Sequence, residues 1–358
     1  MFSLYFCNLA KKMLLYKSLI RKLLFKFNPE TAHKITFGLI KLPFVSQIFK
    51  LLYKKESHLI KSFNYKNLYF QNRIGLAAGL DKDGEAIKSI SALGFGFIEV
   101  GTVTPKPQPG NDKPRLFRLI DQEAIINRMG FNNKGVENIK NKLKKVKNKK
   151  CIIGVNIGKN KTTPLEEAYK DYVYCFKELF EFADYFAINV SSPNTADLRK
   201  LQEPEYLEKI LQELQNVNKT KEGKKPIFLK IAPDLENSSI DTVIELVKKH
   251  NIDGIIATNT TIDRSIINND KYNKLSGGLS GKPLKNKSNE IIKYLKSKSN
   301  NQYIIIGVGG VSNFDDYQEK LNCGADLVQI YTSFIYEGPD IVKQILKKEI
   351  TNNKNKEI

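Results

Sequence analysis

Short apolar runs alternate with amphipathic stretches along the chain from residue 73 onward. Each run has four to six residues, many of them β-branched, which is typical of buried parallel strands. The runs cover residues 74–78, 97–100, 152–156, 185–190, 227–231, 254–258, 303–308 and 327–330. Eight βα units in roughly 275 residues predict an α/β protein built on a (β/α)8 barrel, the TIM barrel. A doubly wound sheet is the alternative, but no GxGxxG motif opens the first unit.

Residues 1–62 carry a different pattern, in which apolar positions follow one face of a helix. The apolar positions are Leu15, Tyr16, Leu19, Ile20, Leu23, Leu24 and Phe27. The basic side chains on the opposite face are Lys17, Arg21, Lys22 and Lys26. Asn28 and Pro29 should end this helix and begin a second one that carries His33. A third apolar stretch follows at residues 44–53.

The charge of the chain is concentrated in this N-terminal segment. The formal net charge is +20, and residues 1–62 hold twelve Lys or Arg residues against two Glu residues. No window reaches the roughly 18 uncharged apolar residues that span a bilayer. A basic helix with a broad apolar face predicts attachment to an anionic membrane surface, and a helical cap packed on the barrel is the alternative. A secretory signal is not expected, because Lys11 and Lys12 follow the first apolar run instead of preceding it.

The remaining composition excludes several classes of protein. Hydrophobic residues make up 41% of the chain, too many for a disordered protein. Elsewhere the lysines are spread diffusely, so we expect a solvated surface and no nucleic-acid partner. The four cysteines form no CxxC pair, which predicts neither a metal site nor a disulfide framework.

Polar residues gather where the predicted strands end, and this is where a barrel of this kind builds its active site. Such residues are costly to bury unless something polar lies among them. They include Asp81, Lys82, Thr102, Asn156, Asn189, Ser192, Asn194, Lys230, Thr258, Asn259 and Thr260. Gly309 and Gly310 after the seventh strand, with Tyr331 and Thr332 after the eighth, predict a phosphate site made of backbone N–H groups.

With these motifs the chain resembles the class 2, quinone-dependent dihydroorotate dehydrogenases. The resemblance extends from about residue 13 to about residue 345. It is carried by residues 28–33, 75–82, 101–118, 127–133, 189–195, 257–264, 277–284 and 307–331. It implies an oxidoreductase of pyrimidine (UMP) biosynthesis that oxidises (S)-dihydroorotate to orotate and passes the electrons to a membrane quinone.

The resemblance implies one bound FMN per chain. The matching positions are Ala78, Gly79, Leu80, Asp81, Lys82, Thr102, Asn156, Asn189, Lys230, Thr258, Gly281, Gly310, Tyr331 and Thr332. Lys230 matches the lysine beside flavin N1, where a cation stabilises the reduced anionic ring. The phosphate group would lie at Gly281, Gly310 and residues 331–332.

The substrate positions follow from the same resemblance. Ser192 matches the catalytic base that takes the C5 proton of dihydroorotate, where class 1 enzymes have a cysteine. A serine hydroxyl needs a closed, dry site to act as a base. The substrate-binding positions are Lys82, Asn127, Arg128, Met129, Gly130, Phe131, Asn132, Asn189, Asn194, Asn259 and Thr260.

The N-terminal segment would form an apolar tunnel for the quinone, with His33, Arg118 and Tyr331 as its polar lining. The expected organisation is a membrane-associating helical segment at 1–62, an FMN-binding barrel at 63–345 and a polar tail at 346–358. We expect a monomer held peripherally on the cytoplasmic side of the inner membrane.

One loop departs from the pattern of the family, which usually has Pro-Gly where this chain has Ala196 and Asp197. This loop resembles the lid over the substrate, so the loss of a glycine puts the lid motion in question. Two other functions remain open: a soluble class 1-type dihydroorotate dehydrogenase, and another FMN-dependent barrel oxidoreductase. Ser192 and the N-terminal segment argue against the former.

Overall fold

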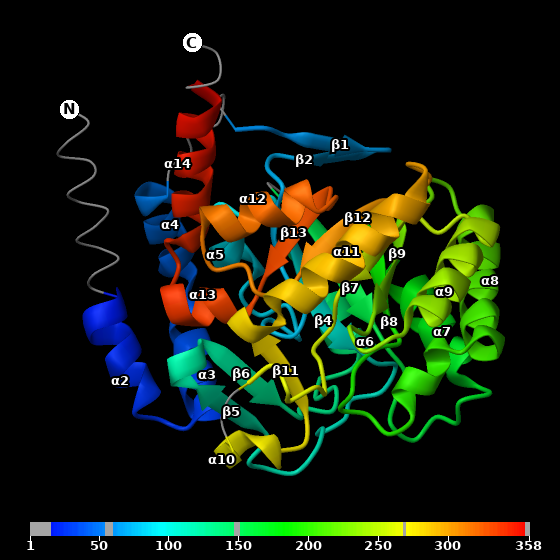
Figure 1. Cartoon of the computed structure of the whole chain (residues 1–358), viewed down its shortest axis with the longest axis horizontal. Coiled ribbons are helices and arrows are strands. Elements are labelled where there is room, and N and C mark those ends of the chain that lie inside the picture. The colour runs from blue at the N-terminus through cyan, green and yellow to red at the C-terminus, as the bar shows by residue number, and fades with distance from the viewer. Residues whose placement is uncertain (1–15, 54–59, 147–150, 268–269, 355–358) are drawn as a thin grey trace.

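Eight parallel strands close into a barrel in the computed structural model, which describes residues 16–53, 60–146, 151–267 and 270–354 (Figure 1). Each of the eight predicted strands is present, and the barrel closes where β13 pairs with β3. The strands are β3 (Ile74–Leu76), β4 (Phe97–Val103), β7 (Ile152–Ile157), β8 (Tyr185–Asn189), β9 (Ile227–Ile231), β10 (Gly254–Ala257), β12 (Ile304–Val308) and β13 (Leu327–Ile330). The predicted (β/α)8 barrel is therefore confirmed.

Helices surround the barrel, because the outward faces of its strands are apolar and must be covered. The larger ones are α7 (Ala168–Leu179), α8 (Pro204–Thr220), α9 (Asn237–Lys249), α11 (Lys285–Ser299), α12 (Phe314–Asn322) and α14 (Ile341–Lys354). The shorter ones are α5 (Ile87–Ser91), α6 (Val136–Leu143), α10 (Asp270–Asn273) and α13 (Thr332–Glu337). Single 3-10 turns occur at Ile120–Gln122, Leu198–Gln202 and Lys282–Leu284.

A hairpin of β1 (Phe63–Tyr65) and β2 (Leu68–Phe70) closes the amino end of the barrel. The Phe70 ring packs edge-on against the Phe97 ring of β4, with the two ring centroids 5.4 Å apart. The Tyr65 hydroxyl donates to the backbone oxygen of Asp253, just before β10 begins. This apolar plug leaves the carboxyl end of the strands as the place for polar chemistry.

A second sheet covers that carboxyl end and was not predicted. Strands β5 (Leu116–Leu119), β6 (Ala124–Asn127) and β11 (Gly278–Gly281) pair antiparallel in the order β11-β6-β5. Figure 1 places this sheet at the end of the barrel opposite the β1–β2 hairpin. It brings residues about 150 positions apart, such as Asn127 and Gly278, into register beside the strand ends.

The N-terminal segment forms a π-helical turn, η1 (Tyr16–Ile20), followed by α2 (Arg21–Phe25), α3 (Pro29–Ile40) and α4 (Pro43–Leu52). The predicted break is confirmed: Asn28 accepts a hydrogen bond from the Glu30 N–H at 3.0 Å, and Pro29 is the first helical residue. No helix among the described residues is long and apolar enough to span a membrane alone, whereas α3 and α4, bent by 84°, meet the criterion as a pair. Residues 1–15 and 54–59 of the segment lie outside the described residues.

Half of the basic face predicted for this segment turns toward the barrel. Lys17 pairs with Glu337 at 2.6 Å, and Arg21 donates to the backbone oxygen of Tyr336 at 2.9 Å. The Tyr16 hydroxyl donates to the oxygen of Ile335 at 2.7 Å. Carbonyl groups at the end of a helix have no partners within that helix, and Tyr16 and Arg21 donate hydrogen bonds to two of them at the end of α13. Lys22 and Lys26 remain exposed.

The expected polar tail at 346–358 needs a correction. Helix α14 continues to Lys354, and Leu346, Glu349 and Ile350 are buried in it. The sequence is rich in Lys and Asn there, but its apolar residues keep helical spacing and pack on the barrel. Helix α14 therefore extends nine residues beyond the predicted boundary at residue 345.

Candidate active site

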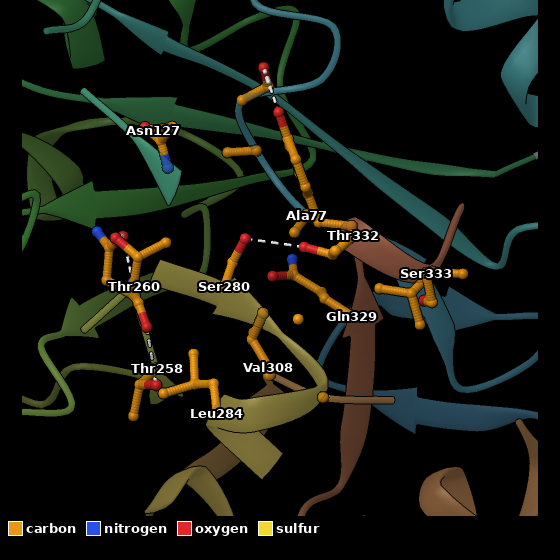
Figure 2. Close-up of a pocket in the computed structure, with 18 of the residues that line it drawn as sticks. Ala77, Asn127, Thr258, Thr260, Ser280, Leu284, Val308, Gln329, Thr332 and Ser333 are labelled. Atoms are coloured by element: carbon orange, nitrogen blue, oxygen red, sulfur yellow. Dashed lines mark hydrogen bonds between the residues drawn. The ribbon is translucent and has the colours of Figure 1, made fainter. Parts of the chain in front are cut away.

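A pocket opens at the carboxyl end of the barrel, between the strand ends and the β5–β6–β11 sheet. Its walls come from the carboxyl-terminal parts of seven of the barrel strands or the segments after them, and from β6 and β11 of the second sheet. In Figure 2 the labelled side chains approach a common space from different elements, with Thr258 and Thr260 on one side and Gln329 and Thr332 on the other. The lining includes the predicted residues Ala78, Gly79, Lys82, Thr102, Asn127, Met129, Gly130, Phe131, Asn189, Ser192, Asn194, Lys230, Thr258, Asn259, Thr260, Gly281, Gly310, Tyr331 and Thr332.

A chain of amide side chains forms one wall of the pocket. Asn156 lies just below the lining and accepts hydrogen bonds from the Thr102 hydroxyl at 2.5 Å and from Asn189 Nδ2 at 3.1 Å. Asn189 Oδ1 in turn accepts from Asn259 Nδ2 at 3.2 Å. These residues end β4, β7 and β8 and follow β10, so the barrel itself fixes their spacing. Such a wall offers both donors and acceptors to a planar ring.

A buried lysine lies at the floor of the pocket. Lys230 is the fourth residue of β9, and its side chain is 6% exposed. Its ammonium lies 3.9 Å from Glu99 Oε1, inside the barrel. Burial lowers the pKa of Lys230, and the Glu99 carboxylate opposes that effect. The floor therefore presents positive charge in a place shielded from water.

Ser192 lies on the side of the pocket next to the β6 end. It is 6% exposed, and its Oγ accepts a hydrogen bond from the Asn194 N–H at 3.3 Å. Asn194 Nδ2 donates to Asn127 Oδ1 at 2.9 Å, while the buried Asn194 Oδ1 has no partner in the described structure. Lys82 reaches the same space, where its ammonium donates to the Gly79 oxygen at 2.7 Å. Burial lowers the pKa of Lys82 to about 8.

Glycines form the side of the pocket where the phosphate is predicted. Gly310 has a φ of 71°, and a Cβ there would lie 2.4 Å from Lys285 Cβ. At Gly281 an added Cβ would lie 2.4 Å from the Glu123 oxygen. Thr332 is the first residue of α13. Its hydroxyl forms a hydrogen bond with the Ser280 hydroxyl (Figure 2), and the two oxygens are 2.8 Å apart. A backbone that can closely approach a ligand and the N-terminus of a helix are two features that bind anions in proteins.

Not every predicted residue reaches this pocket. The Asp81 carboxylate accepts hydrogen bonds from the N–H groups of Glu85 and Ala86, both at 2.8 Å, and burial raises its pKa to about 6. Arg128 donates to the Pro114 oxygen instead of facing the pocket. Leu80, Asp81 and Asn132 line a second cavity, which lies against helix α3.

The second cavity holds two of the three residues predicted for the quinone tunnel. His33 and Tyr331 line it, and Tyr331, Lys82 and Met129 line both cavities. Burial lowers the pKa of His33 to about 3, and the Lys82 charge adds to this effect. The third residue, Arg118, lies over the Phe25 ring at 4.3 Å and donates to backbone oxygens of the α2 end, outside that cavity lining.

The sequence analysis missed several residues in or directly below the pocket, and three of them make polar contacts there. Glu99 is fully buried in β4, Gln329 is fully buried in β13, and Ser280 lies in β11. A charged residue in the middle of an apolar strand was a usable signal for Glu99. Gln329 gave the same signal in the last strand. Ser280 gave none, because β11 was not predicted.

The comparisons with known proteins agree with one another. The sequence profile described as "Dihydroorotate dehydrogenase" matches residues 61–352. A relative from Christiangramia forsetii, named dihydroorotate dehydrogenase (quinone), is 52% identical over 338 residues, which is 93% of this chain and 98% of the relative. This chain belongs to the dihydroorotate dehydrogenase family. The family predicted from the sequence motifs is therefore confirmed.

Two other members of the dihydroorotate dehydrogenase family are also similar to this chain. The Escherichia coli K12/DH10B protein, also named dihydroorotate dehydrogenase (quinone), is 47% identical over 340 residues, or 93% of this chain and 99% of its own. The crystal structure of Eimeria tenella DHODH in complex with ferulenol superposes with a TM-score of 0.82 at 36% identity, covering 92% of each chain. Membership of the family implies a flavin cofactor.

The loop that departs from the pattern of the family keeps a glycine-like backbone. Asp197 has a φ of 54°, in the left-handed region where glycine is unstrained. Aspartate is among the residues that tolerate this region. The chain therefore retains the turn without the glycine, and Arg199 then anchors the loop through Ser191 O, Thr260 O and Asp234.

The glycine cradle gives a direct prediction. We expect Gly310→Ala to weaken flavin retention at least tenfold, because the new methyl group clashes with Lys285 and the φ of 71° becomes strained. Gly223→Ala is the matched control, since Gly223 has a φ of 67° with nothing within 4 Å of an added Cβ. Flavin content after gel filtration, by absorbance, measures the effect. Equal flavin content in both variants would contradict the assignment.

Proposed function

We propose that this chain oxidises (S)-dihydroorotate to orotate, with FMN as its bound cofactor and a membrane quinone as electron acceptor. The observation that carries the proposal is Ser192, buried beside an amide-lined pocket whose floor carries Lys230 and whose far side is a glycine cradle. The relatives named above support the same reaction. The reaction belongs to pyrimidine biosynthesis.

The pocket fits FMN in three separate ways. Gly281 and Gly310 line the pocket and pack so closely on Glu123 and Lys285 that no side chain fits there, which leaves bare backbone for a phosphate. Gln329 Oε1 is a buried acceptor without a partner in the described structure, so the pocket is built to receive a donor. Thr102, Asn189, Lys230 and Thr258 would hold the ring. When bound, FMN supplies a two-electron acceptor for the hydride that leaves C6 of the substrate.

The side chains of the protein would manage the substrate and its proton. Lys82 would pair with the substrate carboxylate, and Asn127, Asn194, Asn259 and Thr260 would bind the pyrimidine amide edges. Ser192 Oγ would take the proton from C5. Its low exposure supports this role, because a weak base works only where water is excluded.

The N-terminal segment would bring the protein to its second substrate. Its exposed apolar residues suit the surface of a lipid layer, where quinones dissolve. His33 and Tyr331 would line the approach of the quinone, and Arg118 would hold the end of α2 beside it. The proposal places a monomer peripherally on the cytoplasmic face of the inner membrane.

An anaerobic titration of the purified protein with dihydroorotate tests the proposal. We expect the oxidised flavin band to bleach at about one equivalent and to return when a quinone is added. A flavin that dihydroorotate does not bleach would overturn the proposed substrate. Bleaching without reoxidation by quinone, but with reoxidation by fumarate, would favour the class 1 alternative.

The pKa of Lys82 makes the substrate affinity dependent on pH. Lysine is charged below its pKa, so the pairing with a carboxylate weakens as the pH rises through about 8. We expect kcat/KM for dihydroorotate to fall up to about tenfold per pH unit above that value. Lys82→Arg should move the fall to higher pH, because a guanidinium stays protonated. A kcat/KM that is flat from pH 7 to 9.5 in the unaltered protein would contradict this assignment.

A further inference from the structure

A fully buried carboxylate lies inside the barrel, one layer below the pocket. Glu99 is the third residue of β4, and it is 0% exposed. It does not line the pocket, and the reaction proposed above does not use it. A buried charge is expensive unless hydrogen bonds and an opposite charge compensate for it, so its surroundings indicate what it does.

The carboxylate has partners on four other strands of the barrel. Its Oε1 accepts a hydrogen bond from Asn156 Nδ2 at 2.8 Å. Its Oε2 accepts from Gln329 Nε2 at 2.7 Å and from the Tyr185 hydroxyl at 3.2 Å. The Lys230 ammonium lies 3.9 Å from Oε1. Glu99 is thus the acceptor at the centre of a polar layer that lies under the pocket floor.

This carboxylate sets the direction of the amide groups above it. An ionised carboxylate only accepts, so Asn156 and Gln329 must both turn their NH2 groups down toward it. Asn156 Oδ1 is then left to accept from Thr102 and Asn189. Gln329 Oε1 is left as an acceptor among the pocket residues, where Figure 2 draws the Gln329 side chain.

The geometry points to Glu99 as a positioning residue: its carboxylate keeps Lys230 cationic at the floor of the pocket and fixes the orientation of the Asn156 and Gln329 amides. The inference rests on the proposed FMN site. Glu99 itself touches neither substrate nor flavin. The positive charge of Lys230 favours the reduced, anionic ring, so the carboxylate controls the flavin potential through its lysine partner.

Apart from Glu99, the titratable groups described around Lys230 are neutral or are paired with other charges. Neighbouring strand β8 carries Tyr185, whose hydroxyl donates to Glu99, and burial raises the Tyr185 pKa well above its usual value, which keeps it neutral. Strand β10 contributes no titratable side chain. Asp234, beyond the end of β9, pairs with Arg199 and Lys287. Burial lowers the pKa of Lys230, and Glu99 is the charged group in the described structure that raises it.

The test is the flavin midpoint potential as a function of pH, measured by chemical reduction of Glu99→Gln with reference dyes. Loss of the neighbouring charge should lower the Lys230 pKa further. At low pH, where Lys230 keeps its proton, the potential should be no lower than that of the unaltered protein, because one negative charge has been removed. As pH rises and Lys230 loses its proton, the potential should fall to the value of the Glu99→Gln/Lys230→Met double variant. The unaltered protein should lack this fall, and any change that comes from Lys82, whose pKa is about 8, should be the same in both proteins.

A matched control separates charge from structure. Glu349→Gln also neutralises a buried glutamate that accepts from a tyrosine, Tyr317, but in α14 far from the pocket. It should leave the potential profile unchanged. A Glu99→Gln profile parallel to that of the unaltered protein at every pH would overturn the inference. Because the reductant is not dihydroorotate, failure of the proposed substrate would leave this measurement readable.

A comparison of unfolding temperatures tests the same pairing if Glu99→Gln folds poorly. Removing one member of a buried pair leaves the other charge uncompensated, so Glu99→Gln and Lys230→Met should each lower the unfolding temperature. The double variant should unfold at a higher temperature than either single variant. Purely additive losses would show that the two groups do not act as a pair and would overturn the inference.

Discussion

Ser192→Ala should slow the reduction of bound flavin by dihydroorotate about 10²–10⁴-fold, the usual contribution of a positioned proton acceptor. Ser192 Oγ is buried and receives one hydrogen bond, from the Asn194 N–H, so its loss removes the base without emptying the pocket. Anaerobic stopped-flow absorbance of the flavin band measures the rate. Flavin content and dihydroorotate affinity should change little, because Lys82 and the amide side chains remain.

Ser299→Ala is the control for this substitution. Ser299 is an equally buried serine whose Oγ donates to the Lys296 oxygen at the end of α11, away from the pocket. It should leave the rate of flavin reduction unchanged. An unaltered rate in Ser192→Ala would show that another group takes the C5 proton.

Four substitutions in the N-terminal segment should release the protein from lipid vesicles. Leu19, Leu23, Phe44 and Leu51 are 60%, 56%, 55% and 80% exposed. Full burial of such a side chain contributes about 1.5–3 kcal/mol, so partial burial of four of them in lipid should be worth at least about 100-fold in affinity. We expect the quadruple change to Gln to weaken cosedimentation with anionic vesicles by that factor. Turnover with a membrane quinone should fall with it.

The barrel chemistry provides the internal control for this prediction. Flavin reduction by dihydroorotate should persist at its normal rate, because none of the four residues lines the pocket. Tyr69 and Tyr174, at 58% and 46% exposed, offer a matched pair outside the segment. Changing both to Gln should leave vesicle binding intact. Equal loss in both variants would mean that lipid binding is not localised to the N-terminal segment.

The barrel could be predicted from the sequence because each strand is a local signal. Residues 227–231, for example, are apolar except for Lys230, and the structure has β9 at those residues. The polar strand ends then followed from the geometry of parallel strands, which places Asn189 and Lys230 side by side. Family motifs added the roles of these residues, but the spacing already indicated where they would meet.

What could not be predicted depends on contacts between distant parts of the chain. β11 pairs with β6 across about 150 residues, and no periodicity reveals such a partner. Glu99 was overlooked because its meaning lies in partners on four other strands. Likewise, Lys17 and Arg21 were predicted on the basic face opposite the apolar residues, and only the end of α13 explains why they turn toward the barrel.

Helix α13 joins two parts of the molecule that have different surroundings. Its first residue, Thr332, lines the pocket, and its last turn is bound by Tyr16, Arg21 and Lys17 of the N-terminal segment. Six helical residues span only about 9 Å. Any displacement of that segment by the bilayer must break these contacts or carry the pocket wall with it. With the proposed membrane attachment, the lateral pressure of the bilayer would act on the pocket wall through α13, and a detergent-solubilised protein would lack that force.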